Sequence, residues 1–435
     1  MTSELFKTSR RQFLAVSATA AAMGFASTTS TEAFGLDTVQ AGGGAAIRPF
    51  RVSVPDSALA DLHRRLVQTR LPDKELVSDF TQGVPLKTIE QLLNHWRDRY
   101  DWRRVEARLN SYPQFITEID GLDIHFVHVR SKHPNAMPVI VTHGWPGSII
   151  EQLKIIDPLT NPTAYGGKAS DAFDVVIPSI PGYGFSAKPT AVGWGPERIA
   201  SAWTTLMRRL GYQKFVAQGG DWGAVITDLI GVQAPPELLG IHTNMPGAIP
   251  PEIDGPAFAG APAPSGLTAE QQGTYDQLVF FYKHVYYAFW MASRPQTMAG
   301  FADSPIGLAT FLLDHDARSL EMIARSFDGQ KEGLSPDDVL DNVTLFWLTN
   351  TGVSSARLYW ENKVPFFSPK GVKVPVVVSV FPDELYHTPR EWAQQAYPKL
   401  IYYNQAPKGG HFAAWEQPEL LVHDMREGFR SLRSA

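Results

Sequence analysis

The sequence contains no cysteine. Disulfide bonds, thiolate nucleophiles and cysteine-ligated metal centres are therefore excluded as sources of stability or of chemistry. Because a chain without cysteine is compatible with both oxidising and reducing compartments, this absence does not locate the protein.

An excess of charge of one sign is also missing. The 39 lysines and arginines stand against 44 aspartates and glutamates, which gives a net charge of −5. A protein that binds nucleic acid normally carries a basic face, so we expect no nucleic-acid partner. Beyond the N-terminal region no apolar run approaches the ~20 residues that a bilayer span needs, and we expect no stable membrane span.

The composition is otherwise that of a globular protein, with 44% hydrophobic and 19% charged residues among 435. This length predicts roughly two or three domains. We divide the chain into a signal and flexible linker, an N-terminal helical segment, the first part of an α/β core, a helical lid and the second part of the core: residues 1–46, 47–112, 113–245, 246–372 and 373–435.

The N-terminus has the features of an export signal. Ser9-Arg10-Arg11-Gln12-Phe13-Leu14 places two arginines before a weakly apolar, alanine-rich stretch that continues to Ala26. This pattern is typical of a twin-arginine signal, and cleavage after Ala33 is compatible with it. We therefore expect a bacterial protein exported to the periplasm or secreted. A disordered tail and an uncleaved membrane anchor stay open as alternatives.

Helical periodicity dominates residues 47–112. Asp56 is a candidate cap for a first helix, and two more helices are predicted over residues 85–100 and 102–109. The segment has no catalytic constellation, so we expect it to pack against the domain that follows. Its histidines, His63 and His95, have no second ligand at metal spacing, and we interpret both as structural.

After residue 113 the pattern changes to strands that alternate with helices. Two alternating strands joined by a turn come first, at 115–119 and 124–129. Continuous apolar runs, which are typical of buried parallel strands, follow at residues 138–142, 173–178 and 214–218. A helix is predicted over 196–210. This succession of strands and helices predicts a doubly wound α/β sheet.

The stretch Gly219-Gly220-Asp221-Trp222-Gly223 lies between the last of these strands and an apolar helical segment. It matches the nucleophile elbow of α/β-hydrolases, with aspartate in place of the usual serine. Small residues flank the nucleophile because the turn is too tight for larger side chains. The motif alone is equally compatible with a structural turn, so its interpretation depends on partners elsewhere in the chain.

Later segments supply such partners. Glu384 follows the apolar strand 374–380, and His411 lies in a glycine-flanked loop before the terminal helix. Nucleophile, acid and histidine follow one another in this order in α/β-hydrolases. We therefore predict Asp221, Glu384 and His411 as a catalytic triad. His387 is a weaker competitor for the base, because it lacks the glycine-flanked loop.

Backbone donors are predicted beside the nucleophile. The strand 138–142 ends in His143-Gly144-Trp145-Pro146-Gly147. In α/β-hydrolases the loop after this strand and the residue after the nucleophile each contribute one N–H group to the oxyanion hole. Here these residues are Trp145 and Trp222. We interpret His143 as a residue that organises the loop.

The sheet pattern is then interrupted for about a hundred residues, which is too long for a plain loop. Residues 246–264 are rich in proline, alanine and glycine and predict a linker that leaves the sheet. Helical pieces are predicted at residues 275–290, 305–313, 336–348 and 354–362. We expect these pieces to form a cap over the site.

From about Ile47 to its C-terminus the chain resembles the microsomal-type epoxide hydrolases, a family that includes the juvenile-hormone epoxide hydrolases. The resemblance rests on the N-terminal segment and on four motifs: His143-Gly144-Trp145-Pro146, Gly220-Asp221-Trp222-Gly223, Asp303-Ser304-Pro305 and Gly409-Gly410-His411-Phe412-Ala413-Ala414. It implies an α/β-hydrolase fold with a helical lid and an N-terminal helical extension. Family members often carry a membrane-anchoring helix where this chain has the twin-arginine-like segment.

The resemblance also implies roles for individual residues. Asp221 would be the nucleophile, His411 the base and Glu384 the acid that orients His411, while the lid tyrosines Tyr287 and Tyr359 would donate protons to the epoxide oxygen. An apolar epoxide would open to a vicinal diol through a covalent ester of the aspartate, which water then hydrolyses. The substrate and water are the implied partners. No metal or organic cofactor is required, and the oligomeric state stays open.

Several alternatives remain at this point. A shift of one residue in the match would replace Glu384 by Asp383 or Tyr287 by Tyr286. A haloalkane dehalogenase also uses an aspartate nucleophile, although two lid tyrosines favour an oxygen over a halide. A serine esterase is disfavoured by Asp221, and a non-catalytic binding protein is disfavoured by the complete set of side chains.

Overall fold

The computed structural model describes residues 44–330 and 333–433. The predicted twin-arginine signal, with its cleavage position after Ala33, lies outside the described residues. No helix within the described ranges is both long enough and apolar enough to cross a membrane.

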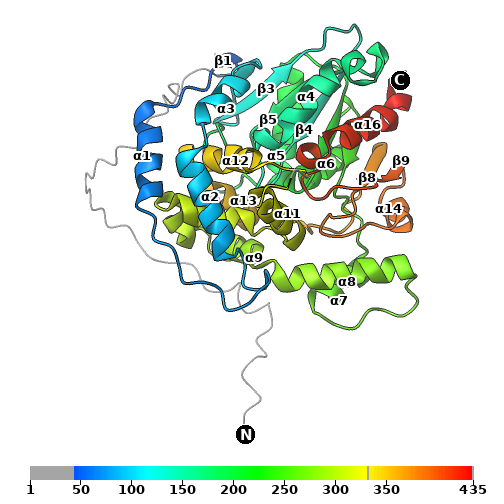
Figure 1. The fold of residues 1–435 in the computed structure, drawn as a ribbon. Helices are drawn as coiled ribbons and strands as arrows, with labels where there is room; N and C mark the ends of the chain where they lie inside the picture. The colour runs from blue at the N-terminus through cyan, green and yellow to red at the C-terminus, as the bar shows by residue number, and fades with distance from the viewer. Residues whose placement is uncertain (1–43, 331–332, 434–435) are drawn as a thin grey trace, which may run out of the picture. The chain divides into compact units, whose positions relative to one another are not determined.

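The described residues form a nine-stranded sheet in the order β1-β2-β3-β5-β4-β6-β7-β8-β9. Figure 1 labels β1, β3, β4, β5, β8 and β9 of this sheet. Its strands are β1 (Arg48–Phe50), β2 (Gln114–Ile119), β3 (Leu122–Val129), β4 (Met137–Thr142), β5 (Phe173–Pro178), β6 (Phe215–Gly219), β7 (Leu238–Thr243), β8 (Val376–Val380) and β9 (Leu400–Gln405). The first three strands and the β3–β5 pair are antiparallel, and every pair from β5 to β9 is parallel. The predicted α/β sheet is thus confirmed.

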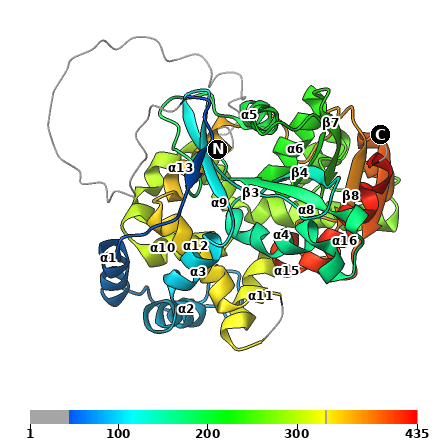
Figure 2. The ribbon, with the colours of Figure 1, turned by 90° about the horizontal axis from the view of Figure 1, so that it is seen from above.

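Helices cover both faces of this sheet, as buried parallel strands require. Figure 2 shows α5 (Pro196–Arg209) and α6 (Trp222–Gln233) on one side, and α4 (Leu153–Thr160) and α16 (Pro418–Gly428) on the other. The parallel strands are apolar and buried, with Val139, Val176 and Val377 fully covered. The carboxyl ends of the strands therefore form one edge, where loops can bring distant segments of the chain together.

The N-terminal segment contains α1 (Asp56–Val67), α2 (Leu86–Asp98) and α3 (Trp102–Leu109). The helices agree with the prediction, whereas β1, which pairs with β2, was not predicted. Asp56 was wrongly predicted as the cap. It is the first helical residue, and its carboxylate pairs with Arg103. The three helices pack against helices of the predicted lid, and His95 Nε2 lies 2.8 Å from Asp337 Oδ1.

Between β7 and β8 the chain is helical. The elements are α7 (Pro251–Phe258), α8 (Ala269–His284), α9 (Tyr286–Ser293), the 3-10 segment η4 (Pro295–Ala302), α10 (Pro305–Leu313), α11 (Ala317–Phe327), α12 (Pro336–Leu348) and α13 (Gly352–Glu361). The prediction of a linker over 246–264 was wrong for α7, because Pro251 occupies the first turn, where proline needs no amide partner. Helix α11 was also missed, although Asp316 caps it.

Candidate active site

Asp221 lies at the end of β6, where the chain turns sharply into α6. Its φ of 50° is in the left-handed region, which non-glycine residues seldom adopt outside strained turns. A Cβ on Gly219 would lie 2.1 Å from the carbonyl oxygen of Gly223, and one on Gly223 would lie 2.0 Å from that of Thr142. The glycines are therefore needed because backbone segments approach each other closely around Asp221.

Two backbone N–H groups point at the carboxylate of Asp221. Trp145, in the loop after β4, donates to Oδ1 at 2.7 Å, and Trp222 also donates its amide. Burial raises the pKa of Asp221, although these two hydrogen bonds and the nearby His411 and His315 counteract that increase. The carboxylate thus lies in a water-poor site and already accepts the backbone N–H groups of both Trp145 and Trp222.

His411 lies in the loop between β9 and the short helix α15 (Ala413–Glu416), and Glu384 follows β8. The His411 Nδ1 atom is 2.6 Å from Glu384 Oε1, so this nitrogen carries the hydrogen and donates it. The opposite nitrogen, Nε2, lies 3.8 Å from Asp221 Oδ2. Three side chains from different parts of the sequence, all buried, are thereby brought together.

Burial alone would lower the pKa of His411. The carboxylates of Glu384, Asp221 and Asp316 outweigh this effect and raise the pKa to about 10. The ring is therefore held as a cation beside an anionic Asp221 before any reaction starts. An imidazole in this state can act as a base only after one of its neighbouring negative charges has been removed.

The two predicted lid tyrosines lie above the nucleophile. Tyr287 in α9 stacks on the Trp145 ring with centroids 4.9 Å apart, and Tyr359 in α13 packs edge-on against Trp222 at 4.8 Å. Burial and the charge of Asp221 raise the pKa of both phenols well above the ordinary value. Both therefore stay protonated and can act as hydrogen-bond donors at neutral pH.

The residues one position away from Tyr287 and Glu384 lie in different surroundings. Tyr286 is 73% exposed, whereas Tyr287 is 6% exposed. The side chain of Asp383 is half-exposed and lies 3.9 Å from Arg318, while Glu384 is the residue that contacts His411. The neighbouring positions therefore have different surroundings from those of the predicted site residues.

The competing histidines have other partners. His387 contributes its backbone N–H to Gln277, and the described contacts link it to none of the triad residues. His143 places Nδ1 3.0 Å from the Gly144 carbonyl, and its Nε2 accepts from the Ile180 amide. His143 thus joins two loops, in agreement with the prediction that it organises the loop.

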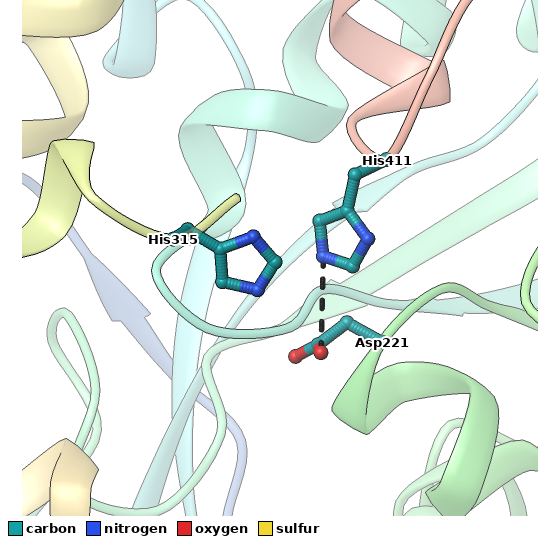
Figure 3. Close-up of side chains that lie close together, drawn as sticks. All are labelled: Asp221, His315 and His411. Atoms are coloured by element: carbon teal, nitrogen blue, oxygen red, sulfur yellow. Dashed lines mark ion pairs between the residues drawn. The ribbon is translucent and has the colours of Figure 1, made fainter. Parts of the chain in front are cut away.

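Sequence reasoning missed a second histidine at the site. His315, between α10 and α11, stacks on His411 with ring centroids 4.3 Å apart. Its Nδ1 lies 2.9 Å from Asp316 Oδ2, so a carboxylate also orients this ring. Figure 3 shows both rings turned toward Asp221. The only signal in the sequence was the adjacent pair His315-Asp316. No pattern in the sequence indicated that this pair faces the turn that carries Asp221.

A polar cavity of about 20 Å³ lies behind the nucleophile and was also missed. It is lined by Asp221 and His411 together with four buried polar side chains: Glu151, Gln152, Gln218 and Asn244. One water molecule needs roughly 10–15 Å³ and two to four polar partners, and both conditions are met here. The cavity can therefore hold a single water that is in reach of both Asp221 and His411.

Glu416 supports the loop that carries His411. Its carboxylate accepts the backbone N–H groups of Gly410 and Phe412, each at 2.9 Å. Burial raises the pKa of Glu416 to about 7, although these hydrogen bonds oppose the change. The histidine is thus fixed through its loop as well as through Glu384.

One set of side chains has the spacing of a cation site. Ligand atoms of Asp221, His315 and His411 lie within 4.8 Å of one another, and all three residues are buried. They offer two imidazole nitrogens and one carboxylate oxygen, a donor set that suits transition ions better than Mg²⁺ or Ca²⁺. Two members of this set are also predicted triad residues.

Comparison with known proteins agrees with this geometry. Residues 47–152 match the family model described as "Epoxide hydrolase N terminus", and residues 137–280 match that of the "alpha/beta hydrolase fold". Over 390 residues the chain is 50% identical to a "Putative epoxide hydrolase" of Stigmatella aurantiaca (strain DW4/3-1), a match that covers 89% of this chain and 86% of the relative. The chain belongs to the epoxide hydrolase family.

Other members of the epoxide hydrolase family are more distant but cover as much of the chain. Epoxide hydrolase 1 of Oryctolagus cuniculus is 36% identical over 399 residues, covering 87% of this chain and 88% of the relative. The crystal structure of juvenile hormone epoxide hydrolase from the silkworm Bombyx mori superposes with a TM-score of 0.79 at 29% identity, covering 90% of this chain and 95% of the other. The predicted resemblance and fold are confirmed.

Proposed function

We propose that the protein hydrolyses apolar epoxides to vicinal diols through a covalent ester on Asp221. One observation carries the proposal: the Asp221 carboxylate lies between backbone N–H donors, a histidine–carboxylate pair and two buried tyrosines. Epoxide opening needs a nucleophile and a proton source on opposite sides of a C–O bond. Membership of the epoxide hydrolase family supports this function.

In the first half-reaction an oxygen of Asp221 attacks an epoxide carbon, and the C–O bond of the three-membered ring breaks. Negative charge develops on the departing oxygen, where Tyr287 and Tyr359 donate hydrogen bonds and one of them transfers its proton. Since the pKa values of both phenols are raised, the protonated donors predominate when substrate binds. The product of this step is an alkyl ester with a free hydroxyl group.

Ester formation changes the charge around His411. The ester removes the negative charge of Asp221, which is one of the charges that raise the pKa of His411. The proton on Nε2 is then held less tightly and passes to the phenolate that the first step left in the lid. The neutral Nε2 nitrogen can then accept a proton from water. A water molecule in the cavity behind Asp221 has access to both groups. Formation of the ester on Asp221 thus converts His411 into a base for the second half-reaction.

In the second half-reaction the activated water attacks the carboxyl carbon of Asp221. The resulting oxyanion is stabilised by the N–H groups of Trp145 and Trp222, which already donate to this carboxylate. Collapse of the tetrahedral intermediate breaks the ester C–O bond, and the departing alkoxide takes the proton from His411 to give the diol. The carboxyl proton of Asp221 then returns to His411, which restores the carboxylate and the cationic ring. One oxygen of the aspartate is exchanged for an oxygen of water in each turnover.

The lining of the site supports apolar substrates. The rings of Phe311, Tyr287 and Tyr359 pack on that of Trp145, whose N–H donates to Asp221, with centroids 4.9–6.2 Å apart in the pairs they form. A ring-lined space favours an epoxide that carries aryl or terpene-like groups, because burial of apolar surface is favourable. A charged group on the epoxide would find no oppositely charged partner among these aromatic rings, so charged epoxides should be poor substrates.

Isotope labelling tests the covalent mechanism. Excess enzyme reacts for a single turnover with styrene oxide in ¹⁸O water, and the label is then located by mass spectrometry. We expect ¹⁸O in the peptide that contains Asp221 and unlabelled oxygen in the first diol. A labelled diol in the first turnover would instead show direct attack by water and would overturn the proposal. The same experiment with a haloalkane reports on dehalogenation separately.

We also propose that the N-terminal segment directs export through the twin-arginine route. The support is the pattern of Arg10 and Arg11 followed by an apolar, alanine-rich stretch. Replacement of both arginines by lysine should retain the protein in the cytoplasm, as seen by fractionation of bacterial cells. Unchanged export of the lysine variant would contradict the proposed route.

A further inference from the structure

His315 has a buried nitrogen that faces the nucleophile. The residue is 4% exposed, and its Nε2 atom has no hydrogen-bond partner among the described residues. Because Nδ1 donates to the carboxylate of Asp316, the neutral ring carries its lone pair on Nε2. A lone pair that is buried in this way is normally met by a donor or a cation.

His411 is arranged in the same manner. Glu384 binds its Nδ1, so when an incoming cation displaces the Nε2 proton of the charged ring, the lone pair lies on Nε2, 3.8 Å from Asp221 Oδ2. The carboxylate of Asp221 can only accept when it is ionised. In the state with neutral rings, three acceptors therefore converge on one point, and their ligand atoms lie within 4.8 Å of one another (Figure 3).

We propose that this point is a binding site for a divalent transition ion of the Zn²⁺ type, which His315, His411 and Asp221 ligate. Two imidazoles and one carboxylate, with water as the fourth ligand, form a usual tetrahedral set for zinc. Ligand distances of 2.0–2.2 Å place the donors about 3.4 Å apart. The His411–Asp221 pair, at 3.8 Å, needs to move a few tenths of an ångström, and the set as a whole, within 4.8 Å, contracts by at most about 1.4 Å when the ion binds.

The surroundings of the three ligands are also those of a metal site. Metal-bound histidines usually donate their second ring nitrogen to a carboxylate, which fixes the tautomer and the orientation of the ring. Glu384 and Asp316 provide this contact for His411 and His315, respectively. Asp316 is itself fixed, because it accepts the Ser319 amide at 2.8 Å. The site is thus preorganised on both imidazole ligands.

The ion would inhibit the enzyme. A metal bound to Asp221 and His411 occupies the proposed nucleophile and base, so epoxide opening stops until the ion leaves. This consequence rests on the proposed function, whereas binding of the ion does not. Substitution of His315 distinguishes ion binding from the proposed hydrolysis, because His315 belongs to the ion site and has no assigned role in the reaction.

Binding is tested first, without any assay of activity. The full-length protein is treated with a chelator and titrated with ZnCl₂ by calorimetry and with CoCl₂ by visible absorption. We expect one ion per chain and the intense absorption bands of tetrahedral Co²⁺. His315→Gln should weaken Zn²⁺ binding at least about 10-fold, and Asp316→Asn should weaken it by about 10- to 100-fold, the usual effect of losing such a contact. MgCl₂ should not bind.

His95→Gln is the matched control. His95 also pairs with a carboxylate, that of Asp337, but it lies in the N-terminal segment away from the donors described above. The control should bind Zn²⁺ as tightly as the parent protein. Failure of the parent to bind Zn²⁺, or equal binding by the parent and by His315→Gln, would overturn the proposal.

Inhibition is tested second. ZnCl₂ should block diol formation by the parent protein and by His95→Gln, a chelator should restore it, and the concentration for half-inhibition should rise at least about 10-fold in His315→Gln. Equal inhibition of the parent and His315→Gln would overturn the assignment of His315 as a ligand. If the parent forms no diol even without metal, the proposed function fails, while the calorimetric result still decides the ion site.

Discussion

The backbone N–H of Trp145 donates to Oδ1 of Asp221 at 2.7 Å, although 76 positions separate the two residues in sequence. The contact joins the loop after β4 to the turn after β6, two neighbouring parallel strands. A donor to the carboxylate in the resting state is also in place for the oxyanion of the ester hydrolysis step. The same contact therefore serves both halves of the proposed reaction.

Removal of the proposed base, His411, should stop ester hydrolysis and leave ester formation intact. In His411→Ala, Asp221 can still attack the epoxide, but no group removes the proton from the hydrolytic water. We expect an alkyl ester to accumulate, visible by intact-mass spectrometry as an increase equal to the mass of the substrate. Asp383→Asn is the control, because this neighbour of Glu384 lies outside the contact with His411 and should turn over normally. A His411→Ala variant that turns over at the parent rate would remove this residue from the role of base.

Tyr287→Phe and Tyr359→Phe should slow ester formation. Each variant removes one proton donor to the departing oxygen, and general acid catalysis contributes about 10²- to 10⁴-fold. Stopped-flow fluorescence of the adjacent tryptophans, Trp145 and Trp222, can follow the single-turnover rate. Tyr286→Phe is the matched control and should behave as the parent, since this side chain is exposed. If all three variants react at the same rate, the lid tyrosines are not the acids.

Much of this site was predictable from the sequence because it depends on local order. Asp221, Glu384 and His411 each follow a strand with a recognisable apolar pattern, and parallel strands bring their carboxyl ends to one edge. The glycines around Asp221 could be interpreted for the same reason, because the tight turn itself requires residues without a Cβ. The order of strands and turns was therefore sufficient to predict the three triad residues.

The missed residues depend on contacts that no local pattern encodes. His315 reaches the site because the turn between α10 and α11 brings it against His411. The apolar spacing of a helix does not specify which loop lies next to that turn. Glu151 lies in a short 3-10 turn and resembles any surface acid until its burial is known. Helix α7 was hidden by a composition rich in proline and glycine, although one proline starts the helix.

Glu151 should make the stability of the protein depend on pH. Burial raises its pKa in the folded protein to about 8, whereas the unfolded chain releases this proton near pH 4.5. Its stabilising contribution is therefore fully present below pH 4.5 and is lost as the pH rises toward 8, with a slope of at most about 1.4 kcal/mol per pH unit. Glu151→Gln removes this titration.

Denaturant unfolding at pH 5, 7 and 8 measures the effect. The free energy of unfolding of Glu151→Gln, relative to the parent, should increase steadily from pH 5 to pH 8. Gln152 can still donate its side-chain amide to the oxygen at position 151, so the variant should fold. A constant difference across the three pH values would mean that Glu151 ionises alike in the folded and unfolded states.

Gly144→Ala should damage catalysis more than stability. A Cβ at this position would lie 2.3 Å from Asp221 Oδ1, closer than any real contact, so the carboxylate or the loop must shift. The shift displaces the Trp145 N–H from the nucleophile, and loss of one such donor costs about 10²- to 10³-fold in turnover. Steady-state kinetics measures this loss, and thermal unfolding shows whether the fold persists.

Gly255→Ala provides the comparison for that substitution. Gly255 lies in α7, where an added Cβ meets no atom within 4 Å. Alanine is the better helix former by up to about 1 kcal/mol, so this variant should be as active as the parent and slightly more stable. Equal activity of Gly144→Ala and Gly255→Ala would show that the loop after β4 can move without cost. The close approach of Gly144 to Asp221 would then not be what positions the nucleophile.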